Sequence, residues 1–192
     1  MKKSFAVIGY GGQGAWHTRQ ILASDVAELA GVYDIDPAKN AAAEKNGIHA
    51  YGSLEELLAD SAVESVVIAV PNDDHKELVI KSLEAGKNVI CEKPVEMSVA
   101  AFDEMTAAAD RTGKLFTVHQ NRRWDVDFLA MKKIVESGEI GGLINIESRI
   151  HGSRGIPSDW RCTKKQGGGM MLDWGVHLID QILQIIKEKI VR

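Results

Sequence analysis

The sequence predicts an α/β protein, with a doubly wound parallel sheet over residues 1–121 and the start of an α+β domain over residues 122–192. Short apolar segments alternate with amphipathic segments through the first part of the chain. Such alternation indicates parallel strands joined by right-handed helical crossovers. Residues 65–70 form a run rich in the β-branched residues Val and Ile, which is typical of a strand covered on both faces.

Local signals place the boundaries of the predicted elements. Asp36 before Pro37 indicates a helix start, because Asp caps free N–H groups and Pro suits the first helical position. Ser53 with Glu56 forms a capping box, and Ser98 is a further N-cap. The predicted strands are residues 5–8, 28–33, 65–70, 88–91 and 115–118, and the predicted helices are residues 15–23, 37–46, 74–85 and 98–111, with another helix beginning after Ser53.

The first predicted strand ends in a glycine-rich turn. Gly9, Gly11 and Gly14 have G-x-G-x-x-G spacing, and Gly12 and Gln13 lie between them. In a strand–turn–helix unit these glycines allow a tight turn, close approach of a pyrophosphate, and close packing of the helix on the strand. The phosphates would lie at the helix N-terminus, where free N–H groups and the helix dipole favour negative charge. A glycine-rich turn without a ligand is the alternative interpretation.

An acidic residue follows the second predicted strand, as a dinucleotide site requires. Asp34 stands 20 residues after Gly14, where a carboxylate would accept the ribose hydroxyls of the adenosine half. Ile35 follows it, with no Arg or Lys beside it, so a 2′-phosphate would meet an acid and no cation. The pattern therefore favours NAD over NADP. A methyltransferase stays open as an alternative, since that class also pairs a glycine-rich loop with such an acid.

Polar residues follow the next three predicted strands, and the carboxyl ends of parallel strands share the edge of the sheet where ligands bind. Lys93 precedes Pro94, which disfavours helical geometry at Lys93 and allows a cis peptide bond that would fix its side-chain direction. A solvated surface lysine is the alternative. The residues expected along this edge are Pro71, Asn72 and His75, then Glu92 and Lys93, then Asn121 and Arg123.

The second part of the chain is predicted to contain a helix over residues 125–137, a strand over residues 141–151 and a later helix with Asp173 and His177. On a helix, residues four apart share one face, and a carboxylate beside a histidine suits proton transfer. A buried, hydrogen-bonded histidine is the alternative. His151, Cys162, Asp173 and His177 lack the tight spacing of metal ligands, so no metal site is predicted.

Composition limits the classes of partner. The net charge of −4 disfavours nucleic acid, which needs clustered Lys and Arg. Two cysteines, Cys91 and Cys162, are too few and too far apart for a disulfide framework, and they indicate free thiols in a reducing cytoplasm. No apolar stretch is long enough for a signal peptide or a membrane span, so no membrane partner is expected.

These motifs, in this order, resemble the Gfo/Idh/MocA oxidoreductase family, whose members include glucose–fructose oxidoreductase and myo-inositol dehydrogenase. The resemblance rests on the glycine loop, Pro71-Asn72 with His75, Glu92-Lys93-Pro94, and Gly167-Gly168-Gly169 followed by Asp173-x-x-x-His177. It implies a Rossmann-type dinucleotide domain, an α+β domain built on a large sheet, and hydride transfer between the nicotinamide and a sugar or polyol.

The resemblance also implies roles for individual residues. The loop from Gly9 to Gly14, Asp34, Pro71, Asn72, His75, Glu92 and Lys93 would bind the cofactor. His177 would take the proton of the reacting hydroxyl, Lys93 would hydrogen-bond the same oxygen, and Asp173 would position substrate and His177. Asn121, Arg123, Trp160 and Arg161 would lie on the substrate side.

The chain differs from the family in length, since the usual member continues through the strands of its second sheet. Residues 185–192 resemble the start of a further strand, and we expect a truncated or split member. The homo-oligomer usual for the family is doubtful for this chain, because the sheet forms its interface. The alternative function is a dinucleotide-binding remnant without turnover.

Overall fold

The computed structural model describes residues 2–152 and 159–186. The chain divides into two compact units, Met1–His119 and Gln120–Arg192. The predicted start of a strand near the C-terminus falls mostly on residues 187–192, which lie outside the described residues.

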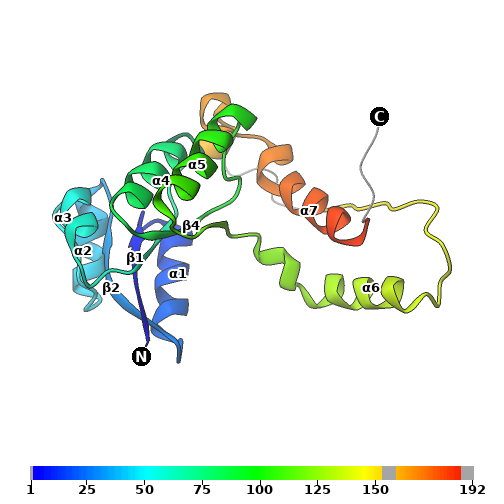
Figure 1. The fold of residues 1–192 in the computed structure, drawn as a ribbon, viewed down its shortest axis with the longest axis horizontal. Coiled ribbons are helices and arrows are strands. Elements are labelled where there is room, and N and C mark those ends of the chain that lie inside the picture. Colours follow the sequence, from blue (N-terminus) through cyan, green and yellow to red (C-terminus); the bar gives the residue numbers. More distant parts are fainter. Residues whose placement is uncertain (1, 153–158, 187–192) are drawn as a thin grey trace. The chain divides into compact units, whose positions relative to one another are not determined.

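The first unit contains one five-stranded sheet in the order β2-β1-β3-β4-β5 (Figure 1). Every neighbouring pair is parallel. The strands are β1 (Lys3–Ile8), β2 (Ala27–Tyr33), β3 (Ser65–Ile68), β4 (Asn88–Cys91) and β5 (Phe116–Val118). The strand order reverses direction beside β1, and such a switch point opens a ligand crevice at the carboxyl ends of the strands. The predicted doubly wound α/β fold is confirmed.

Five helices connect these strands: α1 (Gly12–Leu22), α2 (Pro37–Lys45), α3 (Leu54–Ala59), α4 (His75–Glu84) and α5 (Val99–Thr112). The predicted caps form, because the side chains of Asp36, Ser53 and Ser98 each accept a hydrogen bond from a backbone N–H in the first turn. A short 3-10 turn, η1 (Asn72–Asp74), precedes α4, so that helix begins one residue later than predicted.

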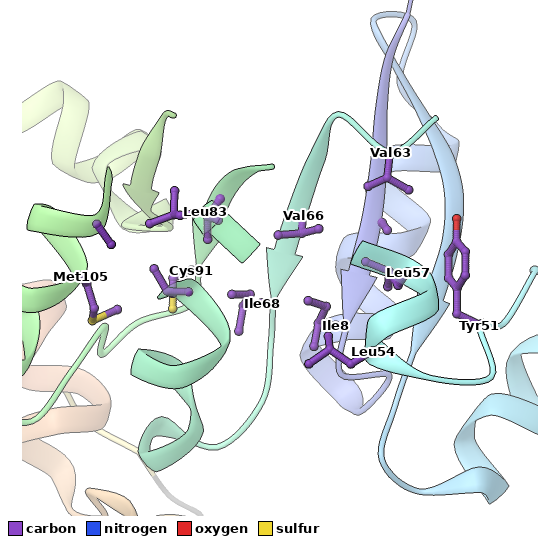
Figure 2. Close-up of a cluster of buried hydrophobic side chains, with 14 residues drawn as sticks. Ile8, Tyr51, Leu54, Leu57, Val63, Val66, Ile68, Leu83, Cys91 and Met105 are labelled. Atoms are coloured by element: carbon purple, nitrogen blue, oxygen red, sulfur yellow. The ribbon is translucent and has the colours of Figure 1, made fainter. Parts of the chain in front are cut away.

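The core follows from the alternation of side chains along the central strands. Ala6, Ile8, Val66 and Ile68 belong to one buried cluster, which Figure 2 shows together with side chains of α3, α4 and α5. The intervening Val7 and Val67 belong to a second cluster with Ile21 of α1 and Ala43 of α2. Both faces of the sheet are therefore covered, as the β-branched run in β3 predicts.

The second unit is built from helical elements in its described residues. These are the 3-10 turn η2 (Asn121–Trp124), helix α6 (Val126–Ser137), the 3-10 turns η3 (Trp160–Cys162) and η4 (Lys164–Gln166), the π turn η5 (Met171–Gly175) and helix α7 (Val176–Ile185). The predicted helix over residues 125–137 is confirmed as α6, and Gly138 ends it with φ of 77°. None of the described helices has the length and apolar character needed to cross a membrane.

The predicted strand over residues 141–151 is wrong, because residues 143–152 have no regular secondary structure. A strand needs a neighbour to bond its backbone N–H and C=O groups. The described part of the second unit contains no strand that could pair with this segment. The apolar pattern of residues 141–151 was therefore not sufficient evidence for a strand.

Candidate functional site

Two glycines of the loop after β1 are required by the fold itself. Gly9 has φ of +93°, and a Cβ on it would lie 2.4 Å from the carbonyl oxygen of Ala69. A Cβ on Gly14 would lie 1.8 Å from the carbonyl oxygen of Gly9. The first glycine thus permits the tight turn, and the second lets α1 pack directly against it.

The other glycines of the loop face open space. A Cβ on Gly11 would have Lys39 Nζ as its nearest neighbour, at 4.0 Å, and a Cβ on Gly12 would meet nothing within 4 Å. Helix α1 begins here, with no acidic residue in its first turn. An open helix N-terminus with no acidic residue in its first turn fits a phosphate group, and the protein's own packing gives no reason for glycine at position 11.

Asp34 lies at the end of β2 and is only 6% exposed. Its Oδ2 accepts a hydrogen bond from the Tyr10 N–H at 2.7 Å, and its Oδ1 accepts one from the Asp36 N–H at 2.9 Å. The Tyr10 bond ties the end of β2 to the glycine loop. A pocket of about 290 Å³ adjoins Asp34, and its lining includes Tyr33, Pro37 and Asn40.

The structure corrects the sequence-based expectation that no cation stands beside Asp34. Lys39 Nζ lies 3.5 Å from Asp34 Oδ2. The lysine was missed because it comes five residues later, in the first turn of α2, and the helix turns it back toward the end of β2. The argument for NAD from an isolated acid is weakened accordingly.

The residues after β3 support the loop that contains Lys93. Pro71 precedes η1, and Asn72 is buried within it. The ring of His75 is fully buried, with Nδ1 3.0 Å from the carbonyl oxygen of Pro94 and Nε2 3.1 Å from that of Val70. Burial lowers the pKa of His75. This geometry makes His75 a link between two loops, and it offers the ring no surface for direct contact with a cofactor.

Glu92 directly follows β4 and is buried beside Lys93. Its Oε1 lies 2.7 Å from His17 Nε2 and 3.0 Å from His119 Nδ1. The same oxygen accepts a hydrogen bond from Gln13 Nε2 at 3.0 Å, and Oε2 accepts one from the Lys93 N–H at 3.1 Å. Glu92 and Gln13, both predicted to bind the cofactor, therefore connect the glycine loop to the Lys93 loop through protein groups.

The two histidine partners of Glu92 also change the pKa of its carboxyl group. Burial by itself would raise the pKa of the Glu92 carboxyl, but hydrogen bonds from His119 and His17 hold that pKa well below its ordinary range. The carboxylate is thus ionised near neutral pH.

The Lys93–Pro94 peptide bond is cis, as the sequence allowed.

In the second unit the predicted catalytic pair spans two elements. Asp173 lies in the π turn η5, and His177 lies in the first turn of α7, where it is buried. The predicted helical segment that contains both residues therefore begins as a π turn, whose hydrogen bonds join residues five apart, and continues directly as α7. Arg161 Nε lies 3.7 Å from Asp173 Oδ1, and the Arg161 guanidinium stacks on the Trp160 ring at 4.5 Å. The structure thus brings the predicted substrate-side residue Arg161 close to Asp173, and places a second one, Trp160, against Arg161.

The turn η2 is fastened to α7. Arg123 donates two hydrogen bonds to the carboxylate of Asp180, at 2.8 and 2.6 Å, and Gln181 donates to the Arg122 carbonyl at 2.9 Å. The Arg122 guanidinium lies 4.3 Å from the centre of the Trp174 ring. The Arg123 guanidinium is bonded to Asp180, so Arg123 holds η2 against α7. These bonds give no support to the predicted contact between Arg123 and substrate. Asn121, another predicted substrate-side residue, lies exposed at the start of η2.

A parallel sheet with a switch point beside β1, a glycine loop before α1 and an acid after β2 define a dinucleotide-binding domain of the Rossmann class. Comparison with known families agrees. Residues 3–120 match the oxidoreductase family with an NAD-binding Rossmann fold, and residues 128–192 match the GFO/IDH/MocA C-terminal domain. The chain belongs to the GFO/IDH/MocA oxidoreductase family.

Individual relatives are similar over much of the chain. The crystal structure of an NAD-binding protein from Listeria innocua has 50% identity and a TM-score of 0.93, over 97% of this chain and 55% of that one. Inositol 2-dehydrogenase 2 of Saccharopolyspora erythraea is 33% identical over 100% of this chain and 56% of its own length. The scyllo-inositol 2-dehydrogenase (NADP(+)) IolW of Bacillus subtilis is 34% identical over 69% of this chain and 37% of its own. The chain spans between 37% and 56% of the length of these relatives.

Proposed function

We propose that this chain contains the dinucleotide-binding domain and part of the substrate domain of an oxidoreductase that acts on the CH–OH group of a sugar or polyol. The observation that carries the proposal is the glycine loop, where a Cβ on Gly11 would meet only Lys39 Nζ, at 4.0 Å, and a Cβ on Gly12 would meet nothing within 4 Å, beside the N-terminus of α1. The inositol dehydrogenases among the relatives support the class of substrate.

The bound dinucleotide would supply or accept the hydride, and the protein would hold the reacting oxygen and its proton. In this scheme the Lys93 ammonium donates a hydrogen bond to the substrate oxygen while the C–O bond changes between single and double. The His177 imidazole takes the hydroxyl proton during oxidation and returns it during reduction. Asp173 orients His177 and the substrate. Lys93 belongs to the first unit, and Asp173 and His177 belong to the second.

The choice between NAD and NADP depends on Asp34 and Lys39. The Asp34 carboxylate would accept the ribose hydroxyls of NAD, as the family pattern implies. Lys39 is 45% exposed at its side chain and could turn toward a 2′-phosphate. We therefore expect the chain to bind NAD more tightly than NADP, with measurable binding of NADP.

Calorimetric titration with NADH and NADPH tests the binding part of the proposal. Micromolar binding corresponds to about −8 kcal/mol, and we expect it for NADH. Failure of a folded chain to bind either dinucleotide would refute the dinucleotide assignment.

A screen of polyols with NAD tests turnover, and Lys93→Met is the diagnostic variant. We expect the NADH dissociation constant to stay within about tenfold while turnover is lost, because a contact made in the transition state affects rate more than binding. Steady-state kinetics and calorimetry on the same samples separate the two effects. Turnover that survives in Lys93→Met would remove the lysine from the catalytic group.

A further inference from the structure

Three side chains at the carboxyl edge of the sheet face one another in a way that dinucleotide binding does not require. They are His17 of α1, Glu92 after β4 and His119 after β5. One nitrogen from each ring and a carboxylate oxygen all lie within 4.8 Å of one another. The two rings pack edge to face with centroids 4.6 Å apart. Since β4 and β5 are neighbours in the sheet, the fold itself brings these residues together.

One carboxylate oxygen of Glu92, Oε1, has three nitrogen neighbours within hydrogen-bond distance. His17 Nε2, His119 Nδ1 and Gln13 Nε2 lie 2.7, 3.0 and 3.0 Å from Oε1. A carboxylate offers about two lone-pair positions on each oxygen, so three donors compete for this one. A cation bound by Oε1 and the two ring nitrogens would remove the competition, because the nitrogens would then coordinate as acceptors of the metal.

The charge of the cluster also suits a cation. The Glu92 side chain is a carboxyl group with only 8% of its surface exposed. Buried carboxylates are normally paired with a cation or bound to a metal. The two imidazole partners are charged only when protonated, so a divalent ion is an alternative source of positive charge.

The ligand types and spacing favour zinc. Two imidazole nitrogens with one carboxylate oxygen form a zinc ligand set, whereas magnesium and calcium prefer oxygen ligands alone. Zinc bonds of about 2.0–2.2 Å in a tetrahedron place ligand atoms about 3.3 Å apart. The two spacings to Glu92 Oε1, 2.7 and 3.0 Å, are about 0.6 and 0.3 Å shorter than that value. Small ring movements would create the geometry, with water as fourth ligand.

The cluster can be reached from solvent. The His119 side chain is 24% exposed, and the exposed Trp16 lies beside both rings, with centroids 5.1 Å from His17 and 5.9 Å from His119. An ion could enter on this side. Trp16 would also report its arrival by a change in fluorescence.

We propose that His17, Glu92 and His119 form a zinc-binding site at the carboxyl edge of the sheet. The site ties α1, which follows the glycine loop, to the segments that contain Lys93 and the end of β5. Each ring nitrogen that binds the ion gives its proton to the other ring nitrogen or, from an imidazolium, to solvent. Zinc affinity therefore rises with pH as protons cease to compete.

The test is titration of the tag-free, chelator-stripped chain with zinc chloride, in a Cys162→Ser background that removes the exposed thiol. Calorimetry should show one ion per chain, and cobalt(II) should give the visible absorption of a tetrahedral site. His17→Gln and His119→Asn are the diagnostic variants, because their amide nitrogens replace Nε2 and Nδ1 in the hydrogen bonds to Glu92 but not as imidazole ligands. Each should weaken zinc binding by at least about tenfold.

His49→Asn is the matched control, since His49 packs edge to face on Tyr51 at 4.6 Å and contacts no member of the cluster in the described interactions. It should leave zinc affinity unchanged. The proposal is overturned if the parent chain binds no zinc, or if both diagnostic variants retain full affinity while folded by circular dichroism. Equal loss in His49→Asn would also overturn it, by placing the ion elsewhere.

Discussion

Glycines in the loop after β1 serve different physical purposes at the scale of single residues. Gly14 is required because α1 packs against the backbone of Gly9 with no space for a Cβ. Gly11 has φ of −79° and open space around it, so its own backbone and neighbours would accept alanine. The spacing of these glycines was visible in the sequence, but only the structure separates those that the fold needs from those that a ligand would need.

Gly11→Ala and Gly14→Ala should therefore fail in different ways. We expect Gly11→Ala to keep its stability within about 0.5 kcal/mol, as surface substitutions usually do, and to lose at least about tenfold in NADH affinity, because the methyl group would occupy the space of the phosphate. Gly14→Ala should unfold or strongly destabilise the first unit. Thermal unfolding and NADH titration check both. Undiminished NADH affinity in Gly11→Ala would contradict the phosphate assignment.

Lys39 and Asp34 should determine the relative affinity for NADPH and NADH. Lys39→Ala should weaken NADPH binding more than NADH binding, because the lysine is the cation nearest to Asp34 in the structure. Asp34→Ala should do the reverse, because the carboxylate would bond the ribose hydroxyls of NAD. Parallel titrations of both dinucleotides with each variant give the two ratios. If each variant weakens both dinucleotides equally, neither residue selects the cofactor.

At the scale of elements, local patterns predicted the first unit well. The caps at Asp36, Ser53 and Ser98 and the β-branched run in β3 depend on short-range chemistry that the sequence displays directly. The segment over residues 141–151 failed because a strand depends on a partner that local pattern does not reveal. The approach of Lys39 to Asp34, and of His17 to Glu92, depends on how helices turn back onto the sheet, so the sequence alone concealed both.

His75 joins two such elements, the end of β3 and the loop after β4, and gives a prediction about pH. Its pKa is lowered by burial, so between its folded pKa and the unfolded value of about 6.5 the unfolded chain binds a proton that the folded chain does not. Stability then falls as pH falls below about 6.5, by at most about 1.4 kcal/mol per pH unit. Hydrogen exchange of buried amides in β3 and β4 at pH 7 and pH 5.5 measures this loss.

His75→Gln is the variant that isolates the contribution. It should be less stable than the parent at pH 7, because the amide does not fill the buried site of the ring, but its stability should change less between pH 7 and pH 5.5. His49→Gln, at an exposed position, should keep the parent's slope. An unchanged slope in His75→Gln would show that another group titrates.

At the scale of the whole molecule, the proposed chemistry depends on residues from both compact units. Gly9, Gly11, Asp34 and Lys93 belong to Met1–His119, whereas Asp173 and His177 belong to Gln120–Arg192. Within the second unit, the bonds from Arg123 and Gln181 stabilise the helix that contains His177. Each unit thus has internal contacts among the elements that contain its proposed functional residues, and such order before binding lowers the cost of ordering them.

Hydrogen–deuterium exchange with successive ligands can test how the two units contribute. NADH should first slow exchange in the glycine loop and in the segment that follows β4, because the proposed cofactor contacts lie there. A polyol that binds the NADH complex should then extend protection to the η5 turn and the start of α7, which hold Asp173 and His177. His177→Ala should keep the first effect and lose the second. If the polyol protects only the first unit in the parent chain, then Asp173 and His177 do not bind substrate, and this chain acts as a dinucleotide-binding module alone.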